Sequence, residues 1–375
     1  MTIQGPEFDI VVVGGGLVGA SLAYGMARQG ARVALIDAHD VAFRASRANL
    51  ALIWVQGKGA GSGPYAELTR HSATLWGGFA RELKDDSGID VHFEQPGGFT
   101  ISLSEGEFEK RRELIRSIQD QPEVGDLGCE MVERAELEKV LPGLGPEVVG
   151  ASTSRLDGHC NSLLLLRALY TAFRRLGGHI LNRREVSRIK PAGDAFIVHT
   201  SEDQIGAGKV VLAAGLGNRD LAGSLSLNAP LTPLKGQILV TEKCAPFLNY
   251  PLVNMRQTQE GGIMIGGSQE DLGYDTTSSV DVMSAIASRI TRIFPFIGSL
   301  NVVRSWAGLR VMTPDGLPLY EESADAPGAF VVNCHSGVTL AAYHAQQLAP
   351  AILSGGLLPS AAYFSGKRFD VHETV

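Results

Sequence analysis

Four residues near the N-terminus have the types and spacing needed to bind a dinucleotide. Gly14, Gly16 and Gly19 fit the pattern G-x-G-x-x-G, and Asp37 follows at the distance typical of a carboxylate that binds a ribose diol. In this pattern the first glycine permits a tight turn, the second admits a pyrophosphate, and the third lets a helix pack closely on a sheet. These residues therefore predict a dinucleotide site, with a glycine-rich turn in an ordinary α/β domain as the alternative.

Two strands and a helix must hold these residues in place. The apolar, mostly β-branched run 9–13 predicts a buried parallel strand, and residues 32–37 predict the next one. Between them, residues 20–29 have the amphipathic spacing of a helix, which Gly30 ends. Because this helix begins at the glycine turn, its free N–H groups would face the pyrophosphate.

A segment of small and polar residues follows the second strand. Residues 45–51 are Ala-Ser-Arg-Ala-Asn-Leu-Ala, and residues 56–63 form a glycine-rich stretch. A simple nicotinamide enzyme would instead continue directly into its next strand–helix unit. Small residues let a backbone approach a flat ligand closely, so we expect part of the ligand site here. A flexible surface loop is the alternative.

Arg310 is the strongest candidate for binding a substrate. A planar guanidinium binds a carboxylate through two parallel charge-assisted hydrogen bonds, which fix the orientation of the carboxylate. A structural salt bridge to a nearby acid such as Asp315 is the alternative. Farther on, residues 330–333 predict a last buried strand, followed by a glycine turn at 334–339 and a helix through 353. That turn would aim a second helix N-terminus at the ligand.

Hydrophobic periodicity predicts the remaining elements, which surround these candidate residues. Further helices are expected at 65–83, 105–119, 161–176 and 280–294. Further strands are expected at 91–93, 99–103, 180–189, 195–200, 209–215, 230–241 and 262–268.

Composition limits the function classes. The 375 residues suggest two domains or one interleaved pair, and a formal net charge of −7 argues against nucleic acid as a partner. Residues 1–4 lack the pattern of a signal peptide, and no apolar run is long enough to cross a bilayer. The four cysteines are scattered, which disfavours a disulfide framework and predicts no metal or iron–sulfur site within this chain. We expect a cytoplasmic protein.

These motifs together resemble the FAD-dependent D-amino acid oxidase superfamily, the group of glycine and sarcosine oxidases, along the whole chain. The resemblance rests on the glycine turn with Asp37, on 45–51, on 210–215, on 308–316 and on the turn before the last helix. Residues 45–59 are most similar to the B (beta) subunits of heteromeric enzymes such as octopine and nopaline oxidases, D-hydroxyproline dehydrogenase and hydrogen cyanide synthase.

The resemblance implies an α/β (α+β) fold of the glycine oxidase type. A Rossmann-like FAD-binding domain (1–85, 150–225 and 305–375) would interleave with a mixed-sheet substrate-binding domain (86–149 and 226–304). FAD should be held noncovalently, because Gly308 stands where sarcosine oxidase relatives attach it through a cysteine. The turn at 334–337 is shorter than that of glycine oxidase, which bears on the flavin contacts expected there.

The resemblance also assigns site residues. The implied FAD contacts are Gly14, Gly16, Leu17, Val18, Gly19, Asp37, Ala38, Ala45, Ser46, Ala48, Asn49, Leu50, Val186, Gly215, His335, Ser336, Gly337, Val338 and Thr339. Arg310 matches the arginine that holds the substrate carboxylate, and Arg256 is a second candidate for substrate binding. His335 is the titratable group that we nominate as a general base, if one is needed.

The expected reaction is oxidation of a carbon–nitrogen bond next to a carboxylate in an opine or a secondary or D-amino acid. Hydride passes to flavin N5, and the imine hydrolyses to an amino acid or amine and a 2-oxo acid. Electrons would continue to larger and small partner subunits that carry an iron–sulfur cluster and FMN, at the inner membrane if the complex binds there. The alternatives are a stand-alone oxidase that uses O₂, a nicotinamide dehydrogenase, and a non-catalytic FAD-holding subunit.

Overall fold

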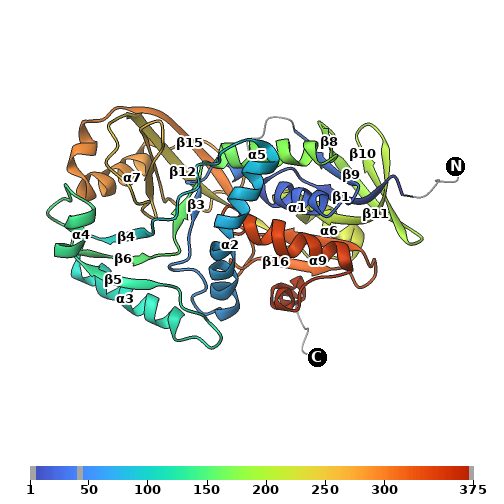
Figure 1. Ribbon diagram of the computed structural model, residues 1–375, viewed down its shortest axis with the longest axis horizontal. Coiled ribbons are helices and arrows are strands. Elements are labelled where there is room, and N and C mark those ends of the chain that lie inside the picture. The colour runs from blue at the N-terminus through green and yellow to red at the C-terminus, as the bar shows by residue number, and fades with distance from the viewer. Residues whose placement is uncertain (1–5, 40–44, 371–375) are drawn as a thin grey trace.

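A large mixed sheet carries the glycine turn in the structure, a computed structural model that describes residues 6–39 and 45–370 (Figure 1). The strand order is β16 (Leu319–Glu322), β17 (Ala329–Asn333), β11 (Gln204–Leu212), β1 (Phe8–Val13), β2 (Val33–Asp37) and β8 (His179–Asn182). The hairpin of β9 (Val186–Ala192) and β10 (Ala195–Thr200) continues from β11 in antiparallel pairing.

The central strands of this sheet are parallel, which decides where the site lies. β1 pairs in parallel with both β2 and β11, and β11 pairs in parallel with β17. The carboxyl ends of parallel strands meet at one edge of a sheet, where α/β proteins bind their ligands. The turn at Gly14, the carboxylate of Asp37 and the end of β17 at Asn333 therefore come to the same edge although they are far apart in the sequence.

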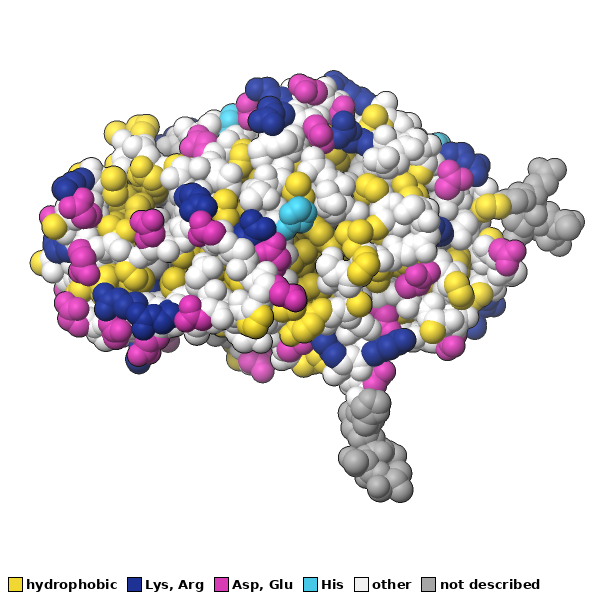
Figure 2. Space-filling model, turned by 60° about the horizontal axis from the view of Figure 1, so that its bottom comes forward, with side chains coloured by type: hydrophobic (Ala, Val, Ile, Leu, Met, Phe, Trp, Pro, Cys, Tyr) yellow, Lys and Arg dark blue, Asp and Glu magenta, His cyan; other side chains and the backbone are white. Residues whose placement is uncertain are grey.

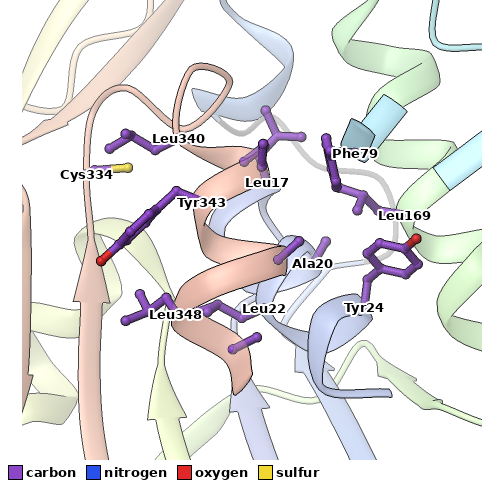
Figure 3. Close-up of a cluster of buried hydrophobic side chains, with 14 of the residues drawn as sticks. Leu17, Ala20, Leu22, Tyr24, Phe79, Leu169, Cys334, Leu340, Tyr343 and Leu348 are labelled. Carbon is purple, nitrogen blue, oxygen red and sulfur yellow. The ribbon is translucent and has the colours of Figure 1, made fainter. Parts of the chain in front are cut away.

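Four helical segments cover one face of the large sheet: α1 (Leu17–Arg28), α2 (Gly63–Ser87), α5 (Ser162–Arg175) and the C-terminal helix. The last consists of α8 (Ala341–Tyr343), a π-helical turn (His344–Leu348) and α9 (Ala349–Ser354). Figure 3 shows Leu22 of α1 beside Leu348, and Tyr24 turned toward Phe79 of α2. This apolar packing fixes the start of α1, and with it the glycine turn, against the rest of the protein.

A second region with antiparallel sheets lies toward the other end of the molecule (Figure 1). One sheet has the order β13 (Met255–Gln257), β14 (Gly262–Gly266), β12 (Thr232–Lys243) and β15 (Val302–Met312); the other has β4 (Gly98–Ser102), β6 (Gly150–Ser154) and β5 (Cys129–Glu133). The helices here are α3 (Glu105–Gln119), α4 (Arg134–Val140) and α7 (Val280–Ile293). Shorter elements are β3 (Leu52–Ile53), which pairs with β7 (Gly158–His159), and α6 (Asn218–Ala222).

Most of the helices and strands expected from the sequence are present, and two expectations were wrong. Residues 91–93 are not a strand; His92 has a φ of 51° and its N–H donates to the Asp90 carboxylate, which makes this segment a turn. The expected strand 180–189 is divided into β8 and β9, because Arg183 adopts a left-handed φ of 60° that breaks the extended backbone.

The expected domain boundaries at residues 150 and 305 both fall at or within strands of the second region. β6 pairs with β4 and β5, and β15 pairs with β12 along most of its length, so residues 150–154 and 305–312 belong to these antiparallel sheets. Arg310 therefore approaches the cavity from the second region. Among residues 6–39 and 45–370, no single helix is long and apolar enough to cross a membrane; one pair bent by 100°, 341–354 with 359–369, passes on length and composition alone.

Candidate active site

A cavity of about 1950 Å³ lies between the carboxyl edge of the large sheet and the sheet formed by β12 and β15. Typical small-molecule pockets occupy roughly 300–1,000 Å³, so this cavity has room for an extended ligand together with a second, smaller one. One end is lined by the glycine turn and Asp37. The other end is lined by Arg310, Lys58 and the turn from Asn333 to Thr339.

The glycines of the turn are required by geometry. Gly14 has a φ of +106°, and a Cβ there would lie 2.4 Å from the carbonyl oxygen of Ala213. A Cβ on Gly19 would lie 1.9 Å from the carbonyl oxygen of Gly14, so α1 can cross the turn only where this side chain is absent. Gly16 caps α1 without a side-chain hydrogen bond, which leaves N–H groups of the first helical turn for an anion.

Asp37 and Ser46 complete this end of the cavity. The Asp37 carboxylate accepts hydrogen bonds from the backbone N–H of Gly15 (2.5 Å) and of His39 (2.8 Å), which hold it beside the glycine turn. Ser46 Oγ accepts from the N–H of Leu17 at 2.9 Å, so its hydroxyl hydrogen is placed at the start of α1. A carboxylate for a diol and a hydroxyl for a phosphate are thus held by backbone bonds of the same turn.

Asn49 shapes the loop that follows. Its Nδ2 donates to the carbonyl oxygens of Ala45 (3.1 Å) and Ser46 (2.9 Å), and its Oδ1 accepts from the N–H of Ala51 (2.8 Å). Ala51 has a φ of 59°, so these bonds hold a conformation that alanine rarely adopts. The small residues of the loop therefore form one wall of the cavity and not a flexible surface loop.

Arg310 lies on β15, and its guanidinium turns toward the cavity over the neighbouring strand β12. Nη1 donates to the carbonyl oxygen of Lys235 at 3.3 Å, and no acid of the described residues forms an ion pair with Arg310. Asp315, the acid that sequence reasoning offered as a structural partner, pairs instead with Arg368, whose Nε lies 2.7 Å from Oδ2. Burial lowers the pKa of Arg310, but a guanidinium stays charged at neutral pH.

A chain of hydrogen bonds lies beside Arg310. Lys58 Nζ donates to His335 Nε2 (3.0 Å) and to Ser336 Oγ (3.1 Å), and the Tyr65 hydroxyl lies 2.8 Å from the same Oγ. The Lys58 charge, burial and the Arg310 charge hold the pKa of His335 well below its usual value. His335 is therefore neutral at physiological pH and is a weak proton acceptor, which argues against the general-base role expected for it.

The comparisons with known proteins agree with this geometry. The model of a family described as FAD dependent oxidoreductase (DAO) matches residues 9–351. The chain belongs to the DAO family of FAD-dependent oxidoreductases. The resemblance drawn from the motifs is thereby confirmed, including its narrower part. The B (beta) subunit of opine oxidase from Rhizobium meliloti is 45% identical over 367 residues, which span 98% of this chain and 99% of that protein.

Further relatives support the same assignment. The corresponding opine oxidase subunit of Agrobacterium tumefaciens (strain Ach5) is 46% identical over 370 residues, which span 98% of this chain and 100% of that protein. The solved structure of glycine oxidase from Geobacillus kaustophilus superposes with a TM-score of 0.86 at 24% identity, covering 96% of this chain and 98% of the other. That likeness establishes the fold, which is of the expected glycine oxidase type.

The cavity fits the FAD of this DAO-family chain. With two exceptions, every residue assigned to FAD or substrate from the sequence lines it. At the far end, Asn333 lines the wall, and its buried Nδ2 has no hydrogen-bond partner among the described residues, so a ligand oxygen can accept from it. A Cβ on Gly308 would lie 2.1 Å from the Cβ of Ala48, so no attaching cysteine fits at that position.

The two exceptions are Gly19 and Arg256. Gly19 acts by allowing the helix to cross the turn, and it does not line the cavity. Arg256 is 5% exposed and lies behind the wall, where Nε donates to the carbonyl oxygen of Leu50 (2.5 Å) and Nη2 to the sulfur of Met264 (3.2 Å). The substrate-binding role expected for Arg256 is therefore not supported; its contacts position Leu50.

Two cations of the cavity wall were missed from the sequence. Lys58 stands between Gly57 and Gly59, whose φ angles of +83° and +77° fold this stretch into the wall, and the glycine pair was the available signal. Arg111 lies on α3, whose charges suggest a solvated face, yet its Nε donates to Ser152 Oγ (2.7 Å) and its Nη2 to Gln56 Oε1 (2.9 Å). The described residues contain no group of three or more His, Cys, Asp or Glu suited to a metal ion.

Proposed function

We propose that this chain oxidises the carbon–nitrogen bond next to a carboxylate in an opine or a related secondary or D-amino acid. The observation that carries the proposal is Arg310, a partly buried guanidinium without an acidic partner among the described residues, at one end of a cavity whose other end is built for a dinucleotide. The similarity to two opine oxidase subunits supports the substrate class. A solved neighbour is named iminodiacetate oxidase, and iminodiacetate is a secondary amine with two carboxylates.

The protein's own residues contribute mainly position and charge. FAD, when bound, supplies an acceptor for two electrons and the hydride that leaves the substrate carbon. Arg310 holds the substrate carboxylate by two parallel hydrogen bonds and so orients the carbon–hydrogen bond that must break. Loss of this hydride from the carbon, assisted by the nitrogen lone pair, leaves an imine that water hydrolyses to an amine and a 2-oxo acid.

The charges of the wall also favour the reactive form of the substrate. Oxidation requires a neutral amine, because an ammonium has no lone pair to assist hydride loss. Lys58 and Arg310 both carry positive charge at this end of the cavity, and nearby positive charge lowers the pKa of an amine. A bound ammonium would therefore release its proton more readily, without a dedicated base at His335.

We further propose that the chain is one subunit of a heteromeric enzyme. The two most similar relatives described above are each named as one lettered subunit of opine oxidase. Electrons would leave the flavin for larger and small partner subunits that carry an iron–sulfur cluster and FMN. The four cysteines of this chain are unpaired and separate, so such a cluster would take its ligands from another chain. A cytoplasmic location, at the inner membrane if the complex binds there, is part of the same proposal.

Anaerobic reduction of the flavin tests the activity. The chain is co-purified with its partner subunits and mixed, without O₂, with opines, secondary amino acids, D-amino acids and glycine. Bleaching of the flavin absorbance by an opine or secondary amino acid, with a 2-oxo acid as product, is the expected result. Bleaching by glycine alone, with rapid peroxide formation by the isolated chain in air, would point to a stand-alone oxidase. No bleaching by any compound would point to an FAD-holding subunit.

A further inference from the structure

Two cations from different elements share the substrate end of the cavity. Arg310 comes from β15, whereas Lys58 comes from the loop between β3 and α2. Lys58 donates to the His335 ring and to the Ser336 hydroxyl, and Arg310 donates to a backbone carbonyl. Neither cation has an acidic partner among the described residues, so both charges are left for a ligand.

The groups that face Lys58 do not neutralise it. They are the His335 ring, the Ser336 hydroxyl, the Tyr65 hydroxyl from α2 and the Cys334 thiol. Burial raises the pKa of the Cys334 thiol to about 12 and raises that of Tyr65 above its usual value, so both are uncharged at neutral pH. Burial, with the nearby Arg310 charge, lowers the pKa of Lys58 to about 8, so at neutral pH this end carries close to two positive charges.

Other cations on the cavity wall are compensated by the protein itself. Arg184 forms ion pairs with Asp203 and with a neighbouring glutamate, and Arg289 lies 2.8 Å from the carboxylate of Glu107. On the outer face shown in Figure 2, basic and acidic side chains are likewise interspersed. Because leaving a buried charge unpaired is costly, two uncompensated cations at one end of a cavity indicate a ligand that brings two negative charges.

We propose that Lys58 is a specificity-determining residue that binds a second carboxylate of the substrate. This inference rests on the proposed function. Arg310 takes the carboxylate next to the carbon that is oxidised, and Lys58 takes the carboxylate on the other substituent of the nitrogen. The amine then lies between the two cations. The preferred substrates are N-(carboxyalkyl) amino acids, and amino acids with a single carboxylate bind more weakly.

Binding of two non-oxidisable ligands tests this without relying on turnover. Thiodiacetate has a thioether between two carboxylates, and (methylthio)acetate has the same thioether and one carboxylate. Their dissociation constants are measured from the change in flavin absorbance of the purified FAD-loaded complex. The wild type should bind thiodiacetate about 10- to 100-fold more tightly, as expected for one further charge-assisted interaction.

Variants at Lys58 separate this role from a merely structural one. Lys58→Met should abolish the preference for thiodiacetate while changing the dissociation constant of (methylthio)acetate by less than about 3-fold, and Lys58→Arg should keep most of the preference. Flavin content and melting temperature show whether each variant is folded. A wild type without the preference, a Lys58→Met variant that keeps it, or equal weakening of both ligands would overturn the inference. Since no oxidation is involved, these outcomes are independent of the flavin-bleaching test.

Discussion

The Arg310 guanidinium lies over Gly236, and a Cβ on Gly236 would stand 2.5 Å from its Nη1. The two residues belong to the paired strands β15 and β12, whose register sets Gly236 opposite Gly308 and Leu234 opposite Arg310. The missing side chain on β12 is what lets the long arginine side chain fold across the strand and keep its charged end at the cavity. Gly236 is therefore part of the substrate site although it has no side chain to bind with.

A Gly236→Ala substitution should displace the guanidinium. We expect KM for an amino-carboxylate substrate to rise about 10-fold or more, equivalent to the loss of one charge-assisted hydrogen bond of about 1.5–3 kcal/mol, with FAD content unchanged. Steady-state kinetics and the flavin spectrum measure these quantities. Gly77→Ala is the matched control, because a Cβ at Gly77 of α2 meets nothing within 4 Å. A KM that stays at the wild-type value would show that the guanidinium does not need this space.

Removing the charge of Arg310 should cost more. In Arg310→Met, we expect kcat/KM to fall by about 100-fold or more, because the substrate loses both its attraction and its orientation, while FAD remains bound. Arg368→Met serves as the control, since that guanidinium pairs with Asp315 outside the site. Turnover of the reconstituted complex by each variant is the measurement. Equal activity of Arg310→Met and wild type would remove the carboxylate anchor and favour an FAD-holding role.

Asp37 should matter for the cofactor and little for the substrate. Asp37→Ala removes the acceptor that holds the N–H of Gly15 and a carboxylate lining the nucleotide end. We expect the dissociation constant of FAD to rise about 10- to 100-fold, measured by titrating apoprotein with FAD. Asp9→Ala, which removes an exposed acid paired with Arg32 near the start of β1, should leave FAD binding intact. Comparable losses in both variants would mean that general destabilisation, not the loss of a ligand contact, weakens FAD binding.

The pH dependence should report Lys58 and not His335. The pKa of His335 is lowered, so this ring has already lost its proton below pH 6.5, and no ionisation of His335 should appear between pH 6 and 7. The pKa of Lys58 is about 8, so its positive charge is lost as the pH rises through that value. We expect thiodiacetate binding to weaken above pH 8 and this dependence to vanish in Lys58→Met. An ionisation near pH 6.5 that His335→Asn removes would contradict the assignment.

Asp157 links the cavity wall to stability. It is buried, and its carboxylate accepts from the N–H of Val55 (2.6 Å) and from Gln56 Nε2 (2.6 Å). Burial raises its pKa to about 7, so the folded protein binds this proton more tightly than the unfolded chain. The resulting stabilisation is complete at low pH and is lost as the pH rises through 7.

The Asp157→Asn variant should therefore be less stable than the wild type, and by a larger margin at pH 5 than at pH 8. It keeps one oxygen acceptor but places an NH₂ group against Gln56 Nε2. Denaturant unfolding at the two pH values measures both margins. A difference in stability that grows with pH would contradict the raised pKa of the native carboxyl group.

The nucleotide end of the site was predictable from the sequence because its parts are local. Gly14, Gly19 and Asp37 lie within one strand–helix–strand unit, where spacing along the chain sets spacing in space. The family, the fold class and FAD followed from the same local motifs. The strand at 91–93 failed, and the strand at 180–189 was divided, because single residues with positive φ override a β-rich pattern.

The sequence by itself determined the cofactor motif, the candidate guanidinium and the order of the elements. Only the tertiary structure decided which charged groups meet. Asp315 is nearer to Arg310 in sequence, yet it pairs with Arg368, whereas Lys58 reaches His335 across 277 positions. Arg256, a plausible ligand by residue type, turns behind the wall to the Leu50 carbonyl. Strand register and packing set these partnerships, because the direction of a long side chain depends on the space that neighbouring strands leave for it.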